Sequence, residues 1–184
     1  MIYVLGGASR SGKTLLARRA VSEKQIPYFP LDALFLALAK GVPQLGVDHE
    51  NSLMERPALM WPVAKPLLDF FFEEESDFLI EGDSVLPSQI QELANEGKPI
   101  RACFLGYTKL NREEKLALIR KHHRGETDWT KDMPDERMLP MVSEMIEFSK
   151  YLEQECDRLG IKYFDVSEDF EGARAKAFEY LFAG

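Results

Sequence analysis

One short run near the start of the chain restricts the possible folds more than any other feature. It reads Gly7-Ala8-Ser9-Arg10-Ser11-Gly12-Lys13-Thr14 and matches G-x-x-x-x-G-K-[ST] at every fixed position. An apolar run from Ile2 to Leu5 precedes it, and a helical pattern from Leu15 to Glu23 follows it. Because a phosphate-binding loop joins a buried strand to a helix, this context predicts a P-loop.

The residue types of this loop suit the binding of a phosphate chain. Glycines let the backbone wrap closely around an anion, with successive N–H groups pointing inward, and the helix N-terminus adds a partial positive charge. We expect residues 7–14 to hold the phosphates of ATP, with Lys13 at the β- and γ-phosphates and Thr14 giving a hydroxyl to Mg²⁺. The alternative is a glycine-rich turn that binds nothing, but such a turn has no need of Lys13 and Thr14.

Beyond the loop, short apolar runs alternate with longer helical patterns, which predicts an α/β fold with a parallel sheet. We expect a three-layer P-loop NTPase fold formed by a single domain over residues 1–184. The five expected strands are 2–5, 26–32, 77–81, 100–107 and 161–166. Helices are expected over 15–23, 87–96, 111–123, 135–159 and 170–182, with two or three more between 33 and 75, one of them starting near Pro62.

The charge distribution indicates which kinds of ligand the chain can bind. Its net charge of −8 argues against a general nucleic-acid binder, which would present a basic surface. Five basic residues but only one acidic residue lie between Met1 and Lys24. We therefore expect an acidic protein with a positive corner that holds a small polyanion.

Cysteines and apolar runs indicate the compartment. Cys103 and Cys156 are far apart and form no CxxC pair, which is typical of reduced thiols in a cytosolic protein. No apolar stretch approaches the ~20 residues of a membrane span, and no signal peptide is recognisable. We expect a cytoplasmic protein with no membrane partner.

An acidic residue at the end of the third expected strand is the candidate for the metal side of the site. Glu81 directly precedes Gly82, and a carboxylate at this edge of a P-loop domain holds a water on the magnesium. Asp83 competes for the same role, so Thr14, Glu81 and Asp83 are the expected metal-side residues. The alternative is that Glu81 merely caps the strand.

Three segments together resemble a known family. They are Gly6 to Thr14, Asp32 after the second strand, and Leu79-Ile80-Glu81-Gly82. The combination resembles the small-molecule P-loop kinases of the adenylate kinase type, including the 2-phosphoglycerate kinase-like and other metabolite-kinase branches. The sequence departs from these branches after Gly82, and it lacks the DGFPR run of adenylate kinases, which counts against a nucleoside-monophosphate acceptor.

The resemblance implies a strand order of 2-3-1-4-5, an acceptor-binding helical insert at about residues 33–75 and a mobile LID at about residues 120–137. It also implies ATP as phosphate donor, Mg²⁺ as cofactor and a small-molecule phosphate acceptor. By the same resemblance, the arginines of the LID neutralise charge on the transferred phosphoryl group or stack on adenine. Arg120 and Arg124 are the expected catalytic arginines, and Arg137 the expected nucleotide-binding one. Since Arg120 and Arg124 are spaced i,i+4, they share one side of a helix end, which would also suit a solvated basic end with no ligand.

The acceptor side is assigned to Asp32, which by the resemblance orients or deprotonates the acceptor hydroxyl. The alternative is that Asp32 is the N-cap of the helix that begins at Ala33. Arg56 lies in the segment where such kinases bind their acceptor and is a candidate for an acidic group of that molecule.

The sequence thus predicts an ATP- and magnesium-dependent phosphotransferase acting on a small molecule. The alternative is an ATP-binding switch or regulatory protein that hydrolyses ATP slowly and has no acceptor. The identity of the acceptor, the choice of ATP over GTP, the oligomeric state and the choice between Asp32 and Asp83 on the acceptor side stay open.

Overall fold

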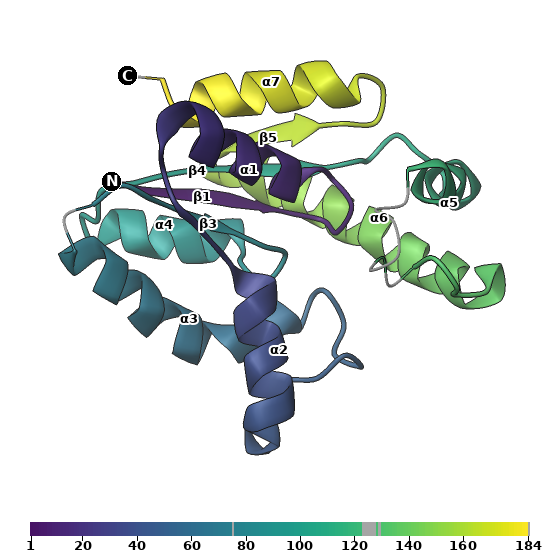
Figure 1. Ribbon diagram of the computed structural model, residues 1–184, viewed down its shortest axis with the longest axis horizontal. Coiled ribbons are helices and arrows are strands. Elements are labelled where there is room, and N and C mark those ends of the chain that lie inside the picture. Colours follow the sequence, from purple (N-terminus) through teal and green to yellow (C-terminus); the bar gives the residue numbers. More distant parts are fainter. Residues whose placement is uncertain (75, 123–127, 129, 184) are drawn as a thin grey trace.

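The computed structural model describes residues 1–74, 76–122, 128 and 130–183. Its centre is a five-stranded parallel sheet in the order β2-β3-β1-β4-β5, as predicted (Figure 1). The strands are β1 (Ile2–Gly7), β2 (Tyr28–Pro30), β3 (Phe78–Glu81), β4 (Ile100–Gly106) and β5 (Lys162–Asp165). A parallel sheet requires a crossover between successive strands, and helices supply each one.

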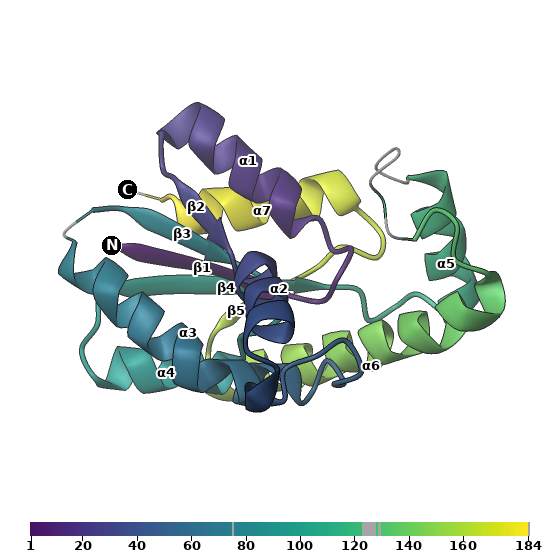
Figure 2. The same cartoon turned by 60° about the horizontal axis from the view of Figure 1, so that its bottom comes forward.

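Helices cover both faces of the sheet and complete the predicted three-layer α/β fold. On one face lie α1 (Lys13–Lys24) and α7 (Phe170–Leu181), and on the other lie α3 (Arg56–Glu73), α4 (Pro87–Asn95) and α6 (Asp135–Leu159) (Figure 2). Two further helices are α2 (Leu31–Gly41), which is followed by the short 3-10 helix η1 (Pro43–Leu45), and α5 (Arg112–Lys121), which packs against α6. Figure 1 shows α2 projecting away from the sheet and α5 beside one end of it. No helix in the described part of the chain has the length and apolarity that a membrane span needs.

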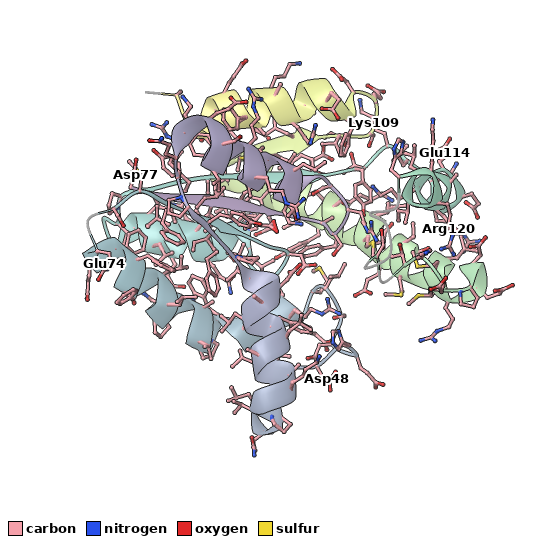
Figure 3. All side chains as sticks on the ribbon, in the orientation of Figure 1. Asp48, Glu74, Asp77, Lys109, Glu114 and Arg120 are labelled. Atoms are coloured by element: carbon pink, nitrogen blue, oxygen red, sulfur yellow. The ribbon has the colours of Figure 1, made fainter. Side chains whose placement is uncertain are left out.

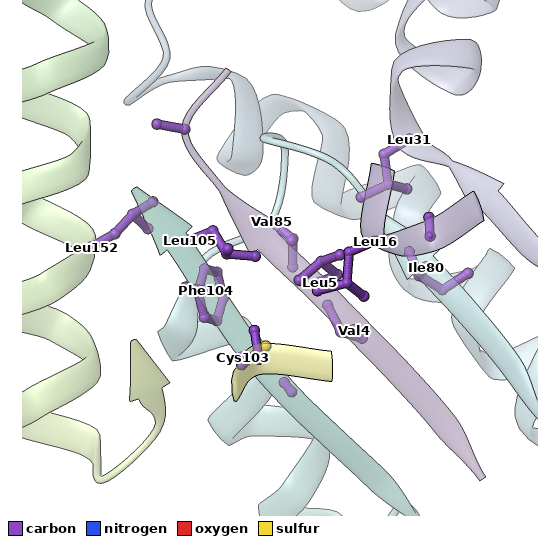
Figure 4. Packing of buried hydrophobic residues seen from close by; sticks show 14 of the residues in the cluster. Val4, Leu5, Leu16, Leu31, Ile80, Val85, Cys103, Phe104, Leu105 and Leu152 are labelled. Atoms are coloured by element: carbon purple, nitrogen blue, oxygen red, sulfur yellow. The ribbon is translucent and has the colours of Figure 1, made fainter. Parts of the chain in front are cut away.

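The core lies between the sheet and its two helical layers. Leu5, Phe104 and Leu105 of the central strands are fully buried, and Leu152 of α6 is fully buried beside Leu105 (Figure 4). Strands β1 and β4 read as nearly continuous apolar runs because helices cover both of their faces. Each such side chain contributes about 1.5–3 kcal/mol on burial, so the core fixes the strands from which the site residues project.

The prediction for the second strand was wrong at its end. The strand stops at Pro30, which is the N-cap residue of α2 with φ −80° and ψ 121°. Asp32 therefore neither ends a strand nor caps a helix; it lies in the first turn of α2, where the helix dipole favours a carboxylate. Leu31, buried at the start of the same turn, anchors this helix end against the core.

The prediction of broken helices between residues 33 and 75 was also partly wrong. A single helix, α3, continues through Pro62 and Pro66 and begins at Arg56, not near Pro62. Each proline leaves the carbonyl four residues earlier without an intrahelical donor. Both prolines lie on the exposed side of α3, so water can hydrogen-bond to those carbonyls and the helix persists.

Candidate functional site

Residues from separate parts of the chain meet at the carboxyl edge of the sheet. Strand β1 lies between β3 and β4, and its Leu5 pairs in register with Glu81. The glycine loop therefore leaves the sheet beside the acidic end of β3. Since the connections of β1 and its neighbours diverge here, this is the switch point at which open α/β sheets bind ligands.

The loop after β1 has the backbone conformation that its glycines permit. Gly7 has φ +136°, and a Cβ there would lie 2.0 Å from the carbonyl oxygen of Leu105. The neighbouring N–H of Ala8 donates to that same oxygen at 3.0 Å. Gly12, with φ +95°, precedes α1, whose first-turn N–H groups have no intrahelical acceptors. The loop is thus a cradle into which N–H groups can point.

Lys13 lies inside this cradle and is only 7% exposed. Its Nζ donates to the carbonyl oxygens of Gly7 at 3.0 Å and Ala8 at 2.9 Å. The sequence predicted a lysine at the phosphates, and in this structure its ammonium is bound by the carbonyls of the loop itself. A buried ammonium needs such partners, because an unpaired one would be strongly disfavoured.

Glu81 lies beside Thr14, as expected of a metal-side pair. The Thr14 hydroxyl donates to Glu81 Oε1 at 3.1 Å. The other carboxylate oxygen, Oε2, is buried and has no hydrogen-bond partner among the described residues, and the same holds for Ser11 Oγ. These orphaned oxygens fit a cation or its water ligands, which are bound by hydroxyl and carboxylate oxygens.

Asp83 contacts a different residue of the loop from Glu81. Its carboxylate is buried and accepts from the hydroxyls of Ser9 at 2.6 Å and Ser84 at 3.2 Å. Within the described ranges, no three His, Cys, Asp or Glu side chains are grouped so that they could hold a metal ion by themselves. A metal at Thr14 and Glu81 would therefore need oxygen ligands from another molecule.

Asp32 faces this edge from the first turn of α2. It keeps part of its surface open to solvent, but surrounding protein atoms displace much of the water around the carboxylate. This desolvation, followed by the charge of Asp83, raises the pKa of Asp32 to about 6, although Lys13 acts in the opposite direction. A carboxylate with such a pKa is suited to accept a proton near neutral pH.

Arg56, at the start of α3, is fixed by its neighbours. Its guanidinium donates to the backbone carbonyls of Asn51 at 3.0 Å and His49 at 3.2 Å, and lies 4.9 Å from the ring centroid of Phe35. Its charge also lowers the pKa of Asp32. Arg56 is thus a cation on the same side of the site as Asp32.

Arg10 makes a contact that the sequence did not predict. Its guanidinium forms a two-pronged ion pair with the buried carboxylate of Asp128, with Nη1 to Oδ2 at 2.9 Å, and also donates to Thr130 Oγ1 at 2.8 Å. The glycine loop is thereby joined to the segment that precedes α6.

Of the three arginines assigned to the LID, the structure describes Arg120 and Arg137. Arg120, labelled in Figure 3, lies in the last turn of α5. It donates to Asp135 at 2.6 Å, to the carbonyl oxygen of Thr130 at 2.5 Å and to that of Met133. Arg137 is exposed on α6, and Arg124 lies outside the described residues. The closure of these arginines over a ligand stays a prediction.

The sequence reasoning missed two residues that contact the loop from outside. Lys115 of α5 is 5% exposed, and its Nζ donates to the carbonyl oxygen of Arg10 at 3.0 Å. The hydroxyl of Tyr107 donates to the carbonyl oxygen of Ser9 at 2.6 Å. The sequence carried no local signal for these contacts, because the burial of Lys115 beside Leu116 on α5 is seen only in the structure.

Comparisons with known proteins agree with this fold. No protein-family profile and no curated protein matches the chain. Solved structures do match. A shikimate kinase from Bacteroides thetaiotaomicron aligns with a TM-score of 0.58 at 15% identity, over 97% of this chain and 97% of that one. A gluconokinase from Sinorhizobium meliloti 1021 aligns with a TM-score of 0.57 at 17% identity, over 97% of this chain and 90% of that one. A sugar kinase from Janibacter sp. HTCC2649 aligns with a TM-score of 0.57 at 18% identity, over 98% of this chain and 93% of that one. The chain therefore has the fold of the P-loop small-molecule kinases.

We expect the carboxyl group of Asp32 to titrate near pH 6, as measured by ¹³C NMR of the nucleotide-free protein. In Asp83→Asn the midpoint should fall toward the ordinary value of 3.8, because a like charge that raises the pKa has been removed. An unchanged midpoint in a folded Asp83→Asn protein would show that the two carboxylates are not coupled. The matched control is Glu96→Gln, which changes an exposed carboxylate at the C-cap of α4 that is ion-paired with Lys65 and is not among the groups that shift the pKa of Asp32.

Proposed function

We propose that this chain is an ATP- and Mg²⁺-dependent phosphotransferase that moves the γ-phosphoryl group to a hydroxyl of a small molecule. The observation that supports this most strongly is the meeting of the Lys13 loop and the Asp32 carboxylate at one edge of the sheet. The small-molecule kinase fold of the structural neighbours agrees with it. We further propose that residues 1–184 act as one domain, with an acceptor-binding insert at about 33–75 and a LID at about 120–137.

On the nucleotide side, the N–H groups of residues 7–14 bind the phosphates. Lys13 exchanges the carbonyls of Gly7 and Ala8 for the β- and γ-phosphate oxygens. Thr14 and Glu81 hold the metal with its water ligands, and Asp83 positions Ser9. When bound, Mg²⁺ neutralises charge on the phosphates.

On the acceptor side, Asp32 orients the acceptor hydroxyl and takes its proton. The hydroxyl oxygen bonds to the γ-phosphorus as the bond from that phosphorus to the bridging oxygen breaks, and ADP leaves with the electron pair. The raised pKa of Asp32 makes it a competent base near neutral pH. Arg56 binds an acidic group of the same acceptor, since its positive charge acts on the Asp32 carboxylate from the start of α3.

Arg120, Arg124 and Arg137 stabilise the transferred phosphoryl group and exclude water once the LID closes. For Arg120 this requires the loss of its contacts with Asp135 and Thr130. Such an exchange of partners would couple LID movement to nucleotide binding.

The direct test is a screen of hydroxy acids, phosphorylated sugars, nucleosides and aminoglycosides, read by ADP release. A kinase should accelerate strongly with one acceptor class, and turnover in Lys13→Ala should fall by about 10²-fold or more. Because Lys13 is buried, Lys13→Met, which fills the space, and a thermal melt of both variants control for folding. Full turnover in a folded Lys13 variant would contradict the proposal. Turnover that is the same with and without every acceptor would favour a nucleotide switch.

Asp32→Asn tests the acceptor side. Phosphoryl transfer should fall by about 10²-fold or more, the scale of a general base, while the affinity for ADP should hardly change because the loop carries that binding. Asn keeps the size of the side chain and one acceptor oxygen but removes the charge. In the wild type, activity should also decline as the pH falls through about 6, since protonated Asp32 cannot accept a proton. A fully active Asp32→Asn enzyme would move the role to Asp83.

The metal should bind with the nucleotide and not before it. Thr14 and Glu81 supply too few ligands for a tight site without phosphate oxygens. Calorimetric titration of Mg²⁺ into the nucleotide-free protein should show no tight binding, whereas removal of Mg²⁺ with a chelator should weaken ATP binding in the wild type but not in Glu81→Gln. Tight binding of Mg²⁺ alone would contradict this assignment.

A further inference from the structure

The apex of the glycine loop has a conformation that its own residues do not favour. Arg10 has φ +63°, in the left-handed region that side chains other than glycine rarely adopt. Such a residue persists only where surrounding contacts hold it. The contacts to the backbone carbonyls on either side of this position come from Tyr107 and Lys115.

These two contacts fix consecutive peptide groups. Tyr107 donates to the carbonyl of Ser9 at 2.6 Å, and Lys115 donates to that of Arg10 at 3.0 Å. In a planar trans peptide the carbonyl and the next N–H point in opposite directions. Holding the two carbonyls outward therefore turns the N–H groups of Arg10 and Ser11 inward. In agreement, the Ser11 N–H donates to the Ala8 carbonyl oxygen within the loop, with an N···O distance of 3.3 Å.

Lys115 and Tyr107 also contact each other, and hydrogen bonds fix the backbone next to each of them. The Lys115 ammonium lies 3.5 Å from the ring centroid of Tyr107, an attractive cation–π geometry. Asn111 caps α5 one turn before Lys115, in a reciprocal pair of bonds with Glu114 at 2.8 and 2.9 Å. Thr108, next to Tyr107, donates to Asp165 of β5 at 2.9 Å from its N–H. The donors are thus fixed before any ligand arrives.

The protonation states of Tyr107 and Lys115 allow both side chains to donate hydrogen bonds to the loop carbonyls. Burial raises the pKa of Tyr107, so its hydroxyl remains a donor. Burial, then the charges of Arg10 and Lys13, lowers the pKa of Lys115 to about 7. An amine donates hydrogen bonds in both its neutral and its charged form, so the bond to Arg10 survives this titration.

We infer that Lys115 and Tyr107 are positioning residues for the phosphate-binding loop, which hold its apex in the conformation that receives a polyphosphate. The inference rests on the proposed nucleotide binding. It assigns a function to α5 that is separate from any LID arginine, because neither residue needs to touch the ligand.

The test is the affinity for ADP with Mg²⁺, measured by calorimetry on Lys115→Met, Tyr107→Phe and the control Lys176→Met, which changes an exposed lysine of α7. Loss of a charged donor in Lys115→Met should weaken binding about tenfold or more, and loss of a neutral donor in Tyr107→Phe about fivefold. The control should stay within about twofold of the wild type.

Melting temperature separates positioning from mere stability. Methionine fills the volume of lysine without a buried charge, so Lys115→Met should melt at the wild-type temperature or above it while binding ADP more weakly. The NMR amide signals of Ser11 and Gly12 should broaden in the same variant. If Lys115→Met does not fold, Tyr107→Phe, which keeps the ring, carries the test.

The outcomes are distinguishable. A wild-type protein that does not bind ADP would overturn the proposed function together with this inference. A wild-type protein that binds ADP, with both variants binding equally well, would overturn this inference alone.

Discussion

The buried charge of Lys13 organises the carboxyl edge of the sheet. An ammonium removed from water needs oxygen partners, and the loop provides two of its own carbonyls. The same charge moderates the pKa of Asp32, which desolvation by neighbouring protein atoms and the charge of Asp83 raise. Asp32 after β2 and Asp83 after β3 can therefore share one site, because the positive charge of Lys13 offsets the repulsion between their carboxylates. That arrangement depends on β1 being paired between β3 and β4.

The fold could be predicted from the sequence to the extent that its determinants are local. The apolar run of β1 and the glycine loop each act over a few residues, and each was found where it was expected. The end of β2 was misplaced because the short Pro30-Leu31-Asp32 segment satisfies the patterns of a strand and of a helix start equally well. Tertiary packing of Leu31 decides between them.

The site was predictable only where its residues are close in the sequence. The loop residues were identified from their spacing, and Glu81 from its place after a strand. The partners of the loop apex were not, because Asp128 and Lys115 are separated from Arg10 by more than a hundred residues. No local pattern marks such pairs; they follow from the arrangement of β4, α5 and α6 around β1.

The cations at this edge already have oxygen partners before any ligand binds. Lys13 is bonded to the loop carbonyls, Arg10 to Asp128 and Arg120 to Asp135. Binding of an anion is therefore an exchange of partners, and its free energy is the difference between two sets of bonds. Neutral carbonyls are weaker partners for an ammonium than phosphate oxygens, since a phosphate oxygen carries negative charge and adds a charge–charge attraction to the hydrogen bond. A nucleoside without phosphates cannot drive the exchange at Lys13, whereas a polyphosphate can. The resting contacts of the loop thus favour charged ligands over neutral ones of similar shape, before any contact with the base or the acceptor is considered.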